Sequence, residues 1–177
     1  MKRNVKSFKN MVAAVVATAI LLLSILGYIF DTYDYLQTKL FGAADYNGAY
    51  VQMIDVGQGD SILLYSSGHA ALIDTGLKSY SGNVEKVLKL KGIDTLDMLL
   101  ITHNHTDHMG GIAEIVNKFN IKTLIIPDLQ KTDERTDRMK QAIEGVKTSG
   151  GECITAEKGT AVSVGEFDIT VIGAYYD

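Results

Sequence analysis

The stretch from Met98 to Phe119 constrains the fold of this chain more than any other. An uncharged apolar run, residues 98–101, is followed by the polar sequence Thr-His-Asn-His-Thr-Asp-His and then by two glycines. Apolar side chains then recur at the i, i+3, i+4 and i+7 positions of one helix face, at Ile112, Ile115, Val116 and Phe119. We therefore expect a buried strand, a polar loop and a helix in this order, and loops held in this way commonly carry function.

The polar loop contains three of the four histidines of the chain, His103, His105 and His108, and Asp107 lies between the last two. Neutral imidazole nitrogens and carboxylate oxygens are good ligands for zinc and similar divalent ions. In extended backbone His103 and His105 point to the same side, and a turn before the two glycines would bring Asp107 and His108 toward them. Four candidate ligands this close together favour two neighbouring metal ions. The alternative is a polar surface loop that is merely rich in histidine.

Two upstream segments extend this pattern, Met-Ile-Asp-Val-Gly-Gln-Gly-Asp-Ser at 53–61 and Leu-Ile-Asp-Thr-Gly at 72–76. With the HxHxDH pattern at 103–108, they resemble the metallo-β-lactamase-like hydrolases. The branch is similar to the C-terminal hydrolase domain of the ComEC/Rec2 competence proteins, which import DNA. The resemblance covers roughly residues 48–177 and implies an α/β fold, the N-terminal half of a layered αββα sandwich.

The rest of the pattern suits this layered architecture. Short apolar runs separated by Gly, Asp and Ser predict an antiparallel meander of three strands near 50–56, 61–66 and 70–74. Helices and strands then alternate. The expected helices are 81–92, 110–119 and 133–147, and the expected strands are 97–102, 121–126, 152–156 and 166–172.

The resemblance also implies roles for the loop side chains. His103 and His105 would hold the first metal, Asp107 and His108 would hold the second, and Asp107 would also orient the nucleophile as the catalytic residue. Paired divalent ions lower the pKa of a bridging water and stabilise negative charge on a carbonyl or phosphoryl oxygen, which gives hydrolysis of an ester, amide or phosphodiester. Zinc is the expected metal for nitrogen-rich sites, and manganese and iron suit the same donors.

Two further acidic residues precede the loop. Asp74 ends a predicted strand, so it either caps its own turn or accepts a hydrogen bond from a ligand histidine and orients it. The family resemblance favours the second role. Asp60 either lies behind the metal ligands at the mouth of the site or simply holds the turn between 57 and 61.

The N-terminal segments predict a membrane anchor. Residues 1–10 carry four basic side chains and no acidic one, and residues 11–30 carry no charge. A helix of this length spans about 30 Å, the thickness of the hydrocarbon layer, and its basic flank favours the cytoplasm. We therefore expect a single-pass protein of the cell membrane, with a juxtamembrane connector at 31–47 and an extracytoplasmic domain at 48–177. The alternative is a cleaved signal peptide, whose apolar core usually has about 7–15 residues, and a secreted protein.

Members of the family normally have a second half, which supplies a further histidine, a bridging aspartate in a Gly-Asp pair and a later His-His-Gly-Ser stretch. No such sequence follows Asp128. We expect a C-terminally incomplete domain, explained by a truncated gene, by the limits of an expressed piece, or by a homodimer that rebuilds the missing half. Weak metal binding and little activity are expected of the isolated chain.

These observations favour a membrane-anchored metal-dependent hydrolase that acts on a phosphodiester or related ester. A nucleic-acid substrate related to DNA uptake is implied by the resemblance alone. The formal net charge is −4 although the first ten residues are basic, so the remainder is too acidic for a bulk binder of phosphates. The alternatives are a non-catalytic anchored half-domain that binds a partner and, less favoured, a β-lactam hydrolase.

Overall fold

The computed structural model describes residues 2–41, 48–128 and 134–173 of the chain. It divides into two compact units, Met1–Asp45 and Tyr46–Asp177, which we describe separately. The first unit contains one helix, α1 (Lys2–Phe41), which includes the apolar run that the sequence predicts as a span. Its segment Asn10–Tyr33 is long and apolar enough to cross a membrane, so α1 is a candidate membrane span by length and composition.

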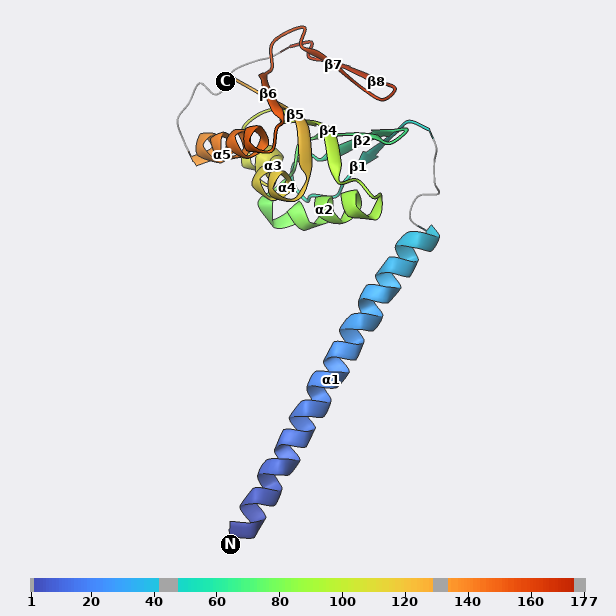
Figure 1. The fold of residues 1–177 in the computed structure, drawn as a ribbon, viewed down its shortest axis with the longest axis vertical. Coiled ribbons are helices and arrows are strands. Elements are labelled where there is room, and N and C mark those ends of the chain that lie inside the picture. Colours follow the sequence, from blue (N-terminus) through green and yellow to red (C-terminus); the bar gives the residue numbers. More distant parts are fainter. Residues whose placement is uncertain (1, 42–47, 129–133, 174–177) are drawn as a thin grey trace. The chain divides into compact units, whose positions relative to one another are not determined.

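The second unit is built on a six-stranded mixed sheet with the strand order β1-β2-β3-β4-β5-β6 (Figure 1). The strands are β1 (Tyr50–Met53), β2 (Ile62–Ser66), β3 (His69–Ile73), β4 (Thr95–Leu100), β5 (Asn120–Ile126) and β6 (Glu152–Thr155). The first three pair antiparallel, which confirms the predicted meander, and β3 to β6 pair parallel. The parallel strands are apolar on both faces because helices and a hairpin cover them from opposite sides.

Helices cover one face of this sheet (Figure 1). They are the 3-10 turn η1 (Lys78–Tyr80), α2 (Ser81–Leu90), α3 (Thr106–Met109), α4 (Ile112–Lys118) and α5 (Glu134–Thr148). The main core lies between them and the sheet, and it includes Val84, Leu88 and Met139 together with the predicted helix-face residues Ile112 and Ile115. The predicted helix 110–119 corresponds to α4. A separate short helix that was not predicted, α3, precedes the two glycines, and the amides of His108 and Met109 at its end both donate to the carbonyl of His105.

A two-stranded hairpin, β7 (Ala161–Val164) and β8 (Phe167–Thr170), packs against the other face of the sheet (Figure 1). The sequence predicts β8 but not β7. The turn of the hairpin lies against β2, where the amide of Glu166 donates to Ser66 Oγ at 3.2 Å and a Cβ on Gly165 would come within 2.7 Å of the Ser66 side chain. The hairpin is therefore part of the layered structure.

Candidate metal centre

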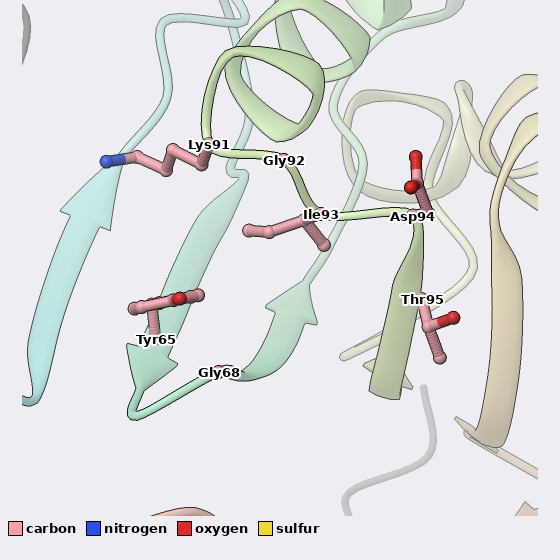
Figure 2. Close-up of a pocket in the computed structure, with 7 residues that line it drawn as sticks. All are labelled: Tyr65, Gly68, Lys91, Gly92, Ile93, Asp94 and Thr95. Carbon is pink, nitrogen blue, oxygen red and sulfur yellow. The ribbon is translucent and has the colours of Figure 1, made fainter.

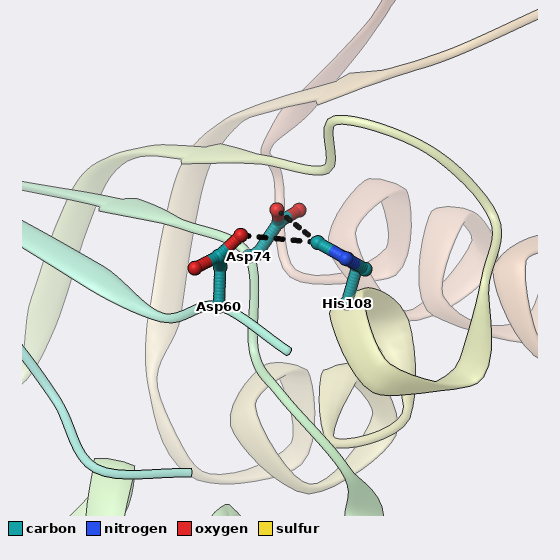
Figure 3. Close-up of side chains that lie close together, drawn as sticks. All are labelled: Asp60, Asp74 and His108. Atoms are coloured by element: carbon teal, nitrogen blue, oxygen red, sulfur yellow. Dashed lines mark hydrogen bonds and ion pairs between the residues drawn. The ribbon is translucent and has the colours of Figure 1, made fainter. Parts of the chain in front are cut away.

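Three segments that lie far apart in the sequence meet at one edge of the sheet. Strands β3 and β4 are parallel, so Asp74 after β3 and the histidine loop after β4 emerge at the same edge. Strand β2 runs antiparallel to β3, so Asp60, two residues before β2, also lies at this edge. Figure 3 shows Asp60 and Asp74 facing His108. Topology thus gathers the candidate residues before any side-chain contact is considered.

The carboxylate of Asp74 joins two parts of the histidine loop. It accepts hydrogen bonds from the amide of Thr102 at 2.8 Å and from its hydroxyl at 2.6 Å. Its Oδ2 also lies 2.8 Å from His108 Nδ1, and Asp74 is only 1% exposed. Because a carboxylate only accepts, Nδ1 carries the proton, and Nε2 of His108 is left with its lone pair for a ligand.

The backbone of Asp74 is in the left-handed region, with φ of +59°. Aspartate tolerates this conformation better than most residues, but it still costs free energy that the surrounding structure has to offset. The amide of Asp74 donates to the carbonyl of Leu100, and Ser61 Oγ donates to the carbonyl of Asp74. These bonds hold the backbone bend that turns the carboxylate toward the histidine loop.

The short helix α3 is fastened to the chain that follows β3. The amide and hydroxyl of Thr75 both donate to the carbonyl of His108, at 2.7 and 3.1 Å. The amide of Gly111 donates to the carbonyl of Gly76, and Gly76 pairs with Met109 in an isolated bridge. The backbone that carries His108 is therefore fixed independently of its side chain.

The four predicted ligand side chains lie together. The ring centre of His103 is 3.9 Å from that of His108 and 4.7 Å from that of His105. Asp107 Oδ2 is 3.8 Å from His108 Nε2, the nitrogen that does not face Asp74. Burial, and then the neighbouring imidazoles of His108 and His105, lower the pKa of His103, which favours its neutral, ligating form. The residue types suit a divalent cation such as Zn²⁺ or Mn²⁺.

Asp60 offers a second way to group candidate ligands. Its Oδ2 is 3.8 Å from His108 Nδ1, and ligand atoms of Asp60, Asp74 and His108 lie within 4.8 Å of one another. A cation between them would need the Nδ1 atom that already contacts Asp74, together with the carboxylate that Thr102 occupies. We therefore interpret Asp74 and Asp60 as groups that orient His108 from behind rather than as ligands.

Thr102 and Thr75 both hold the site together, although the sequence did not predict a role for either. Thr102 Oγ1 also lies 3.0 Å from His103 Nδ1, so it contacts the loop on both sides. A hydroxyl directly before the first histidine and another directly after Asp74 were the only signals in the sequence. Their partners lie 28 and 33 residues away, so the contacts follow from the fold and not from local spacing.

A cavity of about 300 Å³ lies away from this centre. Figure 2 shows its lining, which includes Tyr65 and Gly68 at the end of β2, Lys91 and Gly92 after α2, and Thr95 at the start of β4. The histidine loop follows the opposite end of β4. The strand separates the two by about 20 Å at its ordinary rise per residue, so the cavity is not part of the candidate metal centre.

Comparison with known proteins agrees with this geometry. The profile of the metallo-beta-lactamase superfamily matches residues 54–173, which include all three segments of the site. This chain belongs to the metallo-β-lactamase superfamily. Members of the superfamily usually bind divalent metals, and the imidazoles and the Asp107 carboxylate that contact one another here are donors of the kind that such metals take.

Two relatives extend the comparison of this metallo-β-lactamase superfamily member. The chain is 36% identical over 117 residues to ComE operon protein 3 of Bacillus subtilis, covering 54% of this chain and 15% of that protein. It is 26% identical over 124 residues to exodeoxyribonuclease WalJ of Streptococcus pneumoniae, covering 67% of this chain and 42% of that protein. The predicted resemblance to the ComEC/Rec2 competence proteins is thereby confirmed, and the chain spans less than half the length of either relative.

A solved structure shows the same fold. The metallo-β-lactamase FEZ-1 from Legionella gormanii superposes with a TM-score of 0.50 and 19% identity, covering 70% of this chain and 50% of that chain. The predicted layered α/β architecture of the superfamily is confirmed.

Proposed function

We propose that this chain is a membrane-anchored, metal-dependent hydrolase of phosphodiesters or related esters. The observation that carries the proposal is the meeting of His103, His105, Asp107 and His108 at one edge of the sheet, with His108 held by Asp74. A loop that is merely rich in histidine has no need of a buried carboxylate behind one of its imidazoles. Burial of Asp74 costs free energy that a purely solvated loop would not require.

Each residue has a distinct part in the proposed reaction. His103 and His105 would hold one divalent cation, and Asp107 with His108 would hold a second. When bound, such cations lower the pKa of water to near neutrality and stabilise the charge that develops on phosphoryl oxygens. The free oxygen of Asp107 accepts a hydrogen bond from the attacking water and sets its direction. Asp74 keeps the His108 proton on Nδ1, so that Nε2 remains a donor to the cation.

Phosphodiesters, and nucleic acids among them, are the proposed substrate class. The support is the likeness to ComE operon protein 3 and to a protein named as an exodeoxyribonuclease. The acidic balance of the chain argues against a broad basic surface, so contacts with nucleic acid would be confined to the site. The candidate span in α1 would place the site close to a membrane, on its extracytoplasmic side if the basic N-terminal residues stay in the cytoplasm.

Hydrolysis of bis(p-nitrophenyl) phosphate by the full chain in detergent tests the proposal. We expect slow turnover, because the chain should bind metal weakly, and this turnover should require Zn²⁺ or Mn²⁺, be abolished by a chelator and fall about 100-fold or more in Asp107→Asn. Nitrocefin serves as the β-lactam comparison and should be hydrolysed more slowly. Turnover that ignores the chelator and the substitution would refute the proposal.

A non-catalytic binding module is the second candidate. This candidate is favoured because all four proposed ligands come from a single loop. The remaining histidine, His69, begins β3 at the opposite edge of the sheet. The two candidates differ in one result. A binding module would take up the metal through the same histidines and show no metal-dependent hydrolysis of the phosphodiester.

A further inference from the structure

The loop Gly57–Asp60, between β1 and β2, lies directly against the metal-binding segment. Gly59 has φ of +95°, and a Cβ at this position would come within 1.8 Å of the carbonyl oxygen of Asp107 and 2.9 Å of its Cβ. Backbone therefore packs on backbone, with no space for a side chain between them. Gly68 offers a contrast, because it has a similar φ of +87° but nothing within 4 Å of its virtual Cβ.

Several contacts on its other side keep this loop from moving away from Asp107. Asp55 Oδ1 accepts the amide of Gly57 at 3.0 Å, and Asn83 of α2 donates to the carbonyl of Asp55 at 2.9 Å. Val56 is only 2% exposed and packs so closely that a Cβ on Gly76 would lie 2.4 Å from its own Cβ. The loop is thus held between α2, the segment after β3 and Asp107.

Asp107 needs such support because its own helix is short. Helix α3 has four residues, and a single helical turn has little stability of its own. Thr75 fixes α3 through the carbonyl of His108, and Gly59 bounds it on the side of Asp107. The same loop places the Asp60 carboxylate 3.8 Å from His108 Nδ1. Two of the four proposed ligands therefore depend on where this loop lies.

We propose that the Gly57–Asp60 loop is a positioning element of the metal centre, in which Gly59 fixes the Asp107 carboxylate in its ligating place. The inference rests on the proposed function, because it assigns to Asp107 a role in metal binding. It explains why the Gly-Gln-Gly-Asp sequence accompanies the histidine loop in this chain. A side chain at position 59 would push α3 away from the loop and weaken the cation site without touching a ligand.

Metal affinity of Gly59→Ala and Gly68→Ala, measured on the full chain in detergent, tests this inference. Both substitutions place alanine at a positive φ, but only the first displaces Asp107. A Mn²⁺ titration followed through the histidine C2–H signals gives the affinity, since bound Mn²⁺ broadens the signals of nearby rings. We expect Gly59→Ala to bind about 10–100-fold more weakly and Gly68→Ala to bind as the wild type does.

The four histidines make the readout internal to the protein. In the wild type we expect broadening of the His103, His105 and His108 signals at Mn²⁺ concentrations that leave His69 sharp. Equal affinity of Gly59→Ala and wild type, or equal weakening in both glycine variants, would overturn the inference and leave the proposed function standing. Absence of broadening in the wild type would overturn both.

A second variant covers the case in which Gly59→Ala does not fold. Asn83→Ala removes the exposed side chain that holds Asp55 from α2 and adds no atoms near Asp107. We expect metal affinity to fall about 3- to 10-fold, the size of effect of one lost hydrogen bond, while the melting temperature stays close to that of wild type. An unchanged affinity in this variant would contradict the positioning role of the loop.

Discussion

At the scale of single residues, Asp74 decides how the candidate metal centre is organised. Its carboxylate is shared between Thr102 and His108, and it lies in a conformation that few residues adopt without cost. Turn capping and histidine orientation were the two alternatives for Asp74 from the sequence. The described hydrogen bonds of its carboxylate go to Thr102 and His108, 28 and 34 residues away, which supports the orienting role.

We predict that Asp74→Asn weakens metal binding while the fold persists. The side chain of asparagine has one accepting oxygen, and its NH2 group can only donate. It cannot accept hydrogen bonds from Thr102 and His108 on both sides as the carboxylate does, so His108 loses its fixed orientation and a buried donor loses its partner. We expect affinity for Zn²⁺ about 10–100-fold lower by calorimetric titration, and unfolding free energy about 1–3 kcal/mol lower in urea. Asp94→Asn, at the exposed opposite edge of the sheet, is the matched control. Wild-type affinity in Asp74→Asn would refute the orienting role.

At the scale of elements, the apolar pattern predicted those parts in which it is pronounced. The buried parallel strands were found because they contain continuous apolar runs, and α2, α4 and α5 were found because apolar residues recur in them with a helical period. Helix α3 was missed because its four residues hold only one buried apolar side chain, Met109. Strand β7 was missed because only one of its four residues, Val164, is fully buried. Val164 is buried by packing against the second face of the sheet, which the sequence alone does not reveal.

We predict that Val164→Ala destabilises the domain through this second face. Val164 is 2% exposed between the hairpin and the sheet, and its replacement removes two buried methyl-sized groups. Urea unfolding should show a loss of about 1–2.5 kcal/mol, whereas Ala161→Gly, at the exposed start of the same strand, should cost less. Equal stability of Val164→Ala and wild type would mean that the hairpin does not pack as described.

Three neighbouring strands are also joined by charge. The carboxylate of Asp97 in β4 lies 2.6 Å from Nζ of Lys122 in β5. It also accepts a hydrogen bond from the amide of Ala70 in β3 at 3.0 Å and lies 3.2 Å from Nδ1 of His69. Burial raises the pKa of Asp97, but the hydrogen bonds from Lys122 and Ala70 outweigh it, and the resulting pKa lies below the ordinary value of 3.8.

This shift predicts a particular acid dependence of stability. Because the pKa of Asp97 is lower in the folded state than in the unfolded state, ionised Asp97 stabilises the fold. This stabilisation is complete above the pKa of the unfolded state and is lost as the pH falls through the pKa of the folded state. Thermal unfolding measured from pH 7 to pH 3 should show a loss of stability below about pH 4, and this loss should be smaller in Asp97→Asn than in the wild type. That variant should also be about 1–2 kcal/mol less stable at neutral pH. Parallel curves for the two proteins would contradict the assignment.

At the scale of the whole molecule, the sequence specified the family better than it specified the site. The HxHxDH spacing alone supported only a cluster of ligands, and the likeness to a known family supplied their roles. The likeness favoured an orienting role for Asp74, but neither source of prediction identified His108 as the histidine that Asp74 and Asp60 face, because those contacts arise where segments 34 and 48 residues apart meet at one edge. Local spacing carries no information on such an edge until the strand order is known.

The candidate span in α1 gives a prediction for the whole chain. Residues 10–33 should keep the protein in the membrane pellet after alkaline carbonate extraction, because the apolar segment is long enough to cross the hydrocarbon layer. Removal of residues 1–33 should release the protein into the soluble fraction. Its mass on a denaturing gel reports cleavage, since a processed form would be smaller than the full chain. A full-length wild-type protein found in the soluble fraction would contradict the anchor.

The central claim is that the histidine loop gathers its imidazoles on shared cations, and X-ray absorption at the zinc edge tests it most directly. In the presence of excess zinc, the full chain should show nitrogen and oxygen ligands at about 2.0–2.1 Å with scattering from more than one imidazole. Replacement of His103 and His108 by alanine should remove that imidazole scattering. A wild-type spectrum without imidazole scattering, or one that the double variant leaves unchanged, would contradict the account.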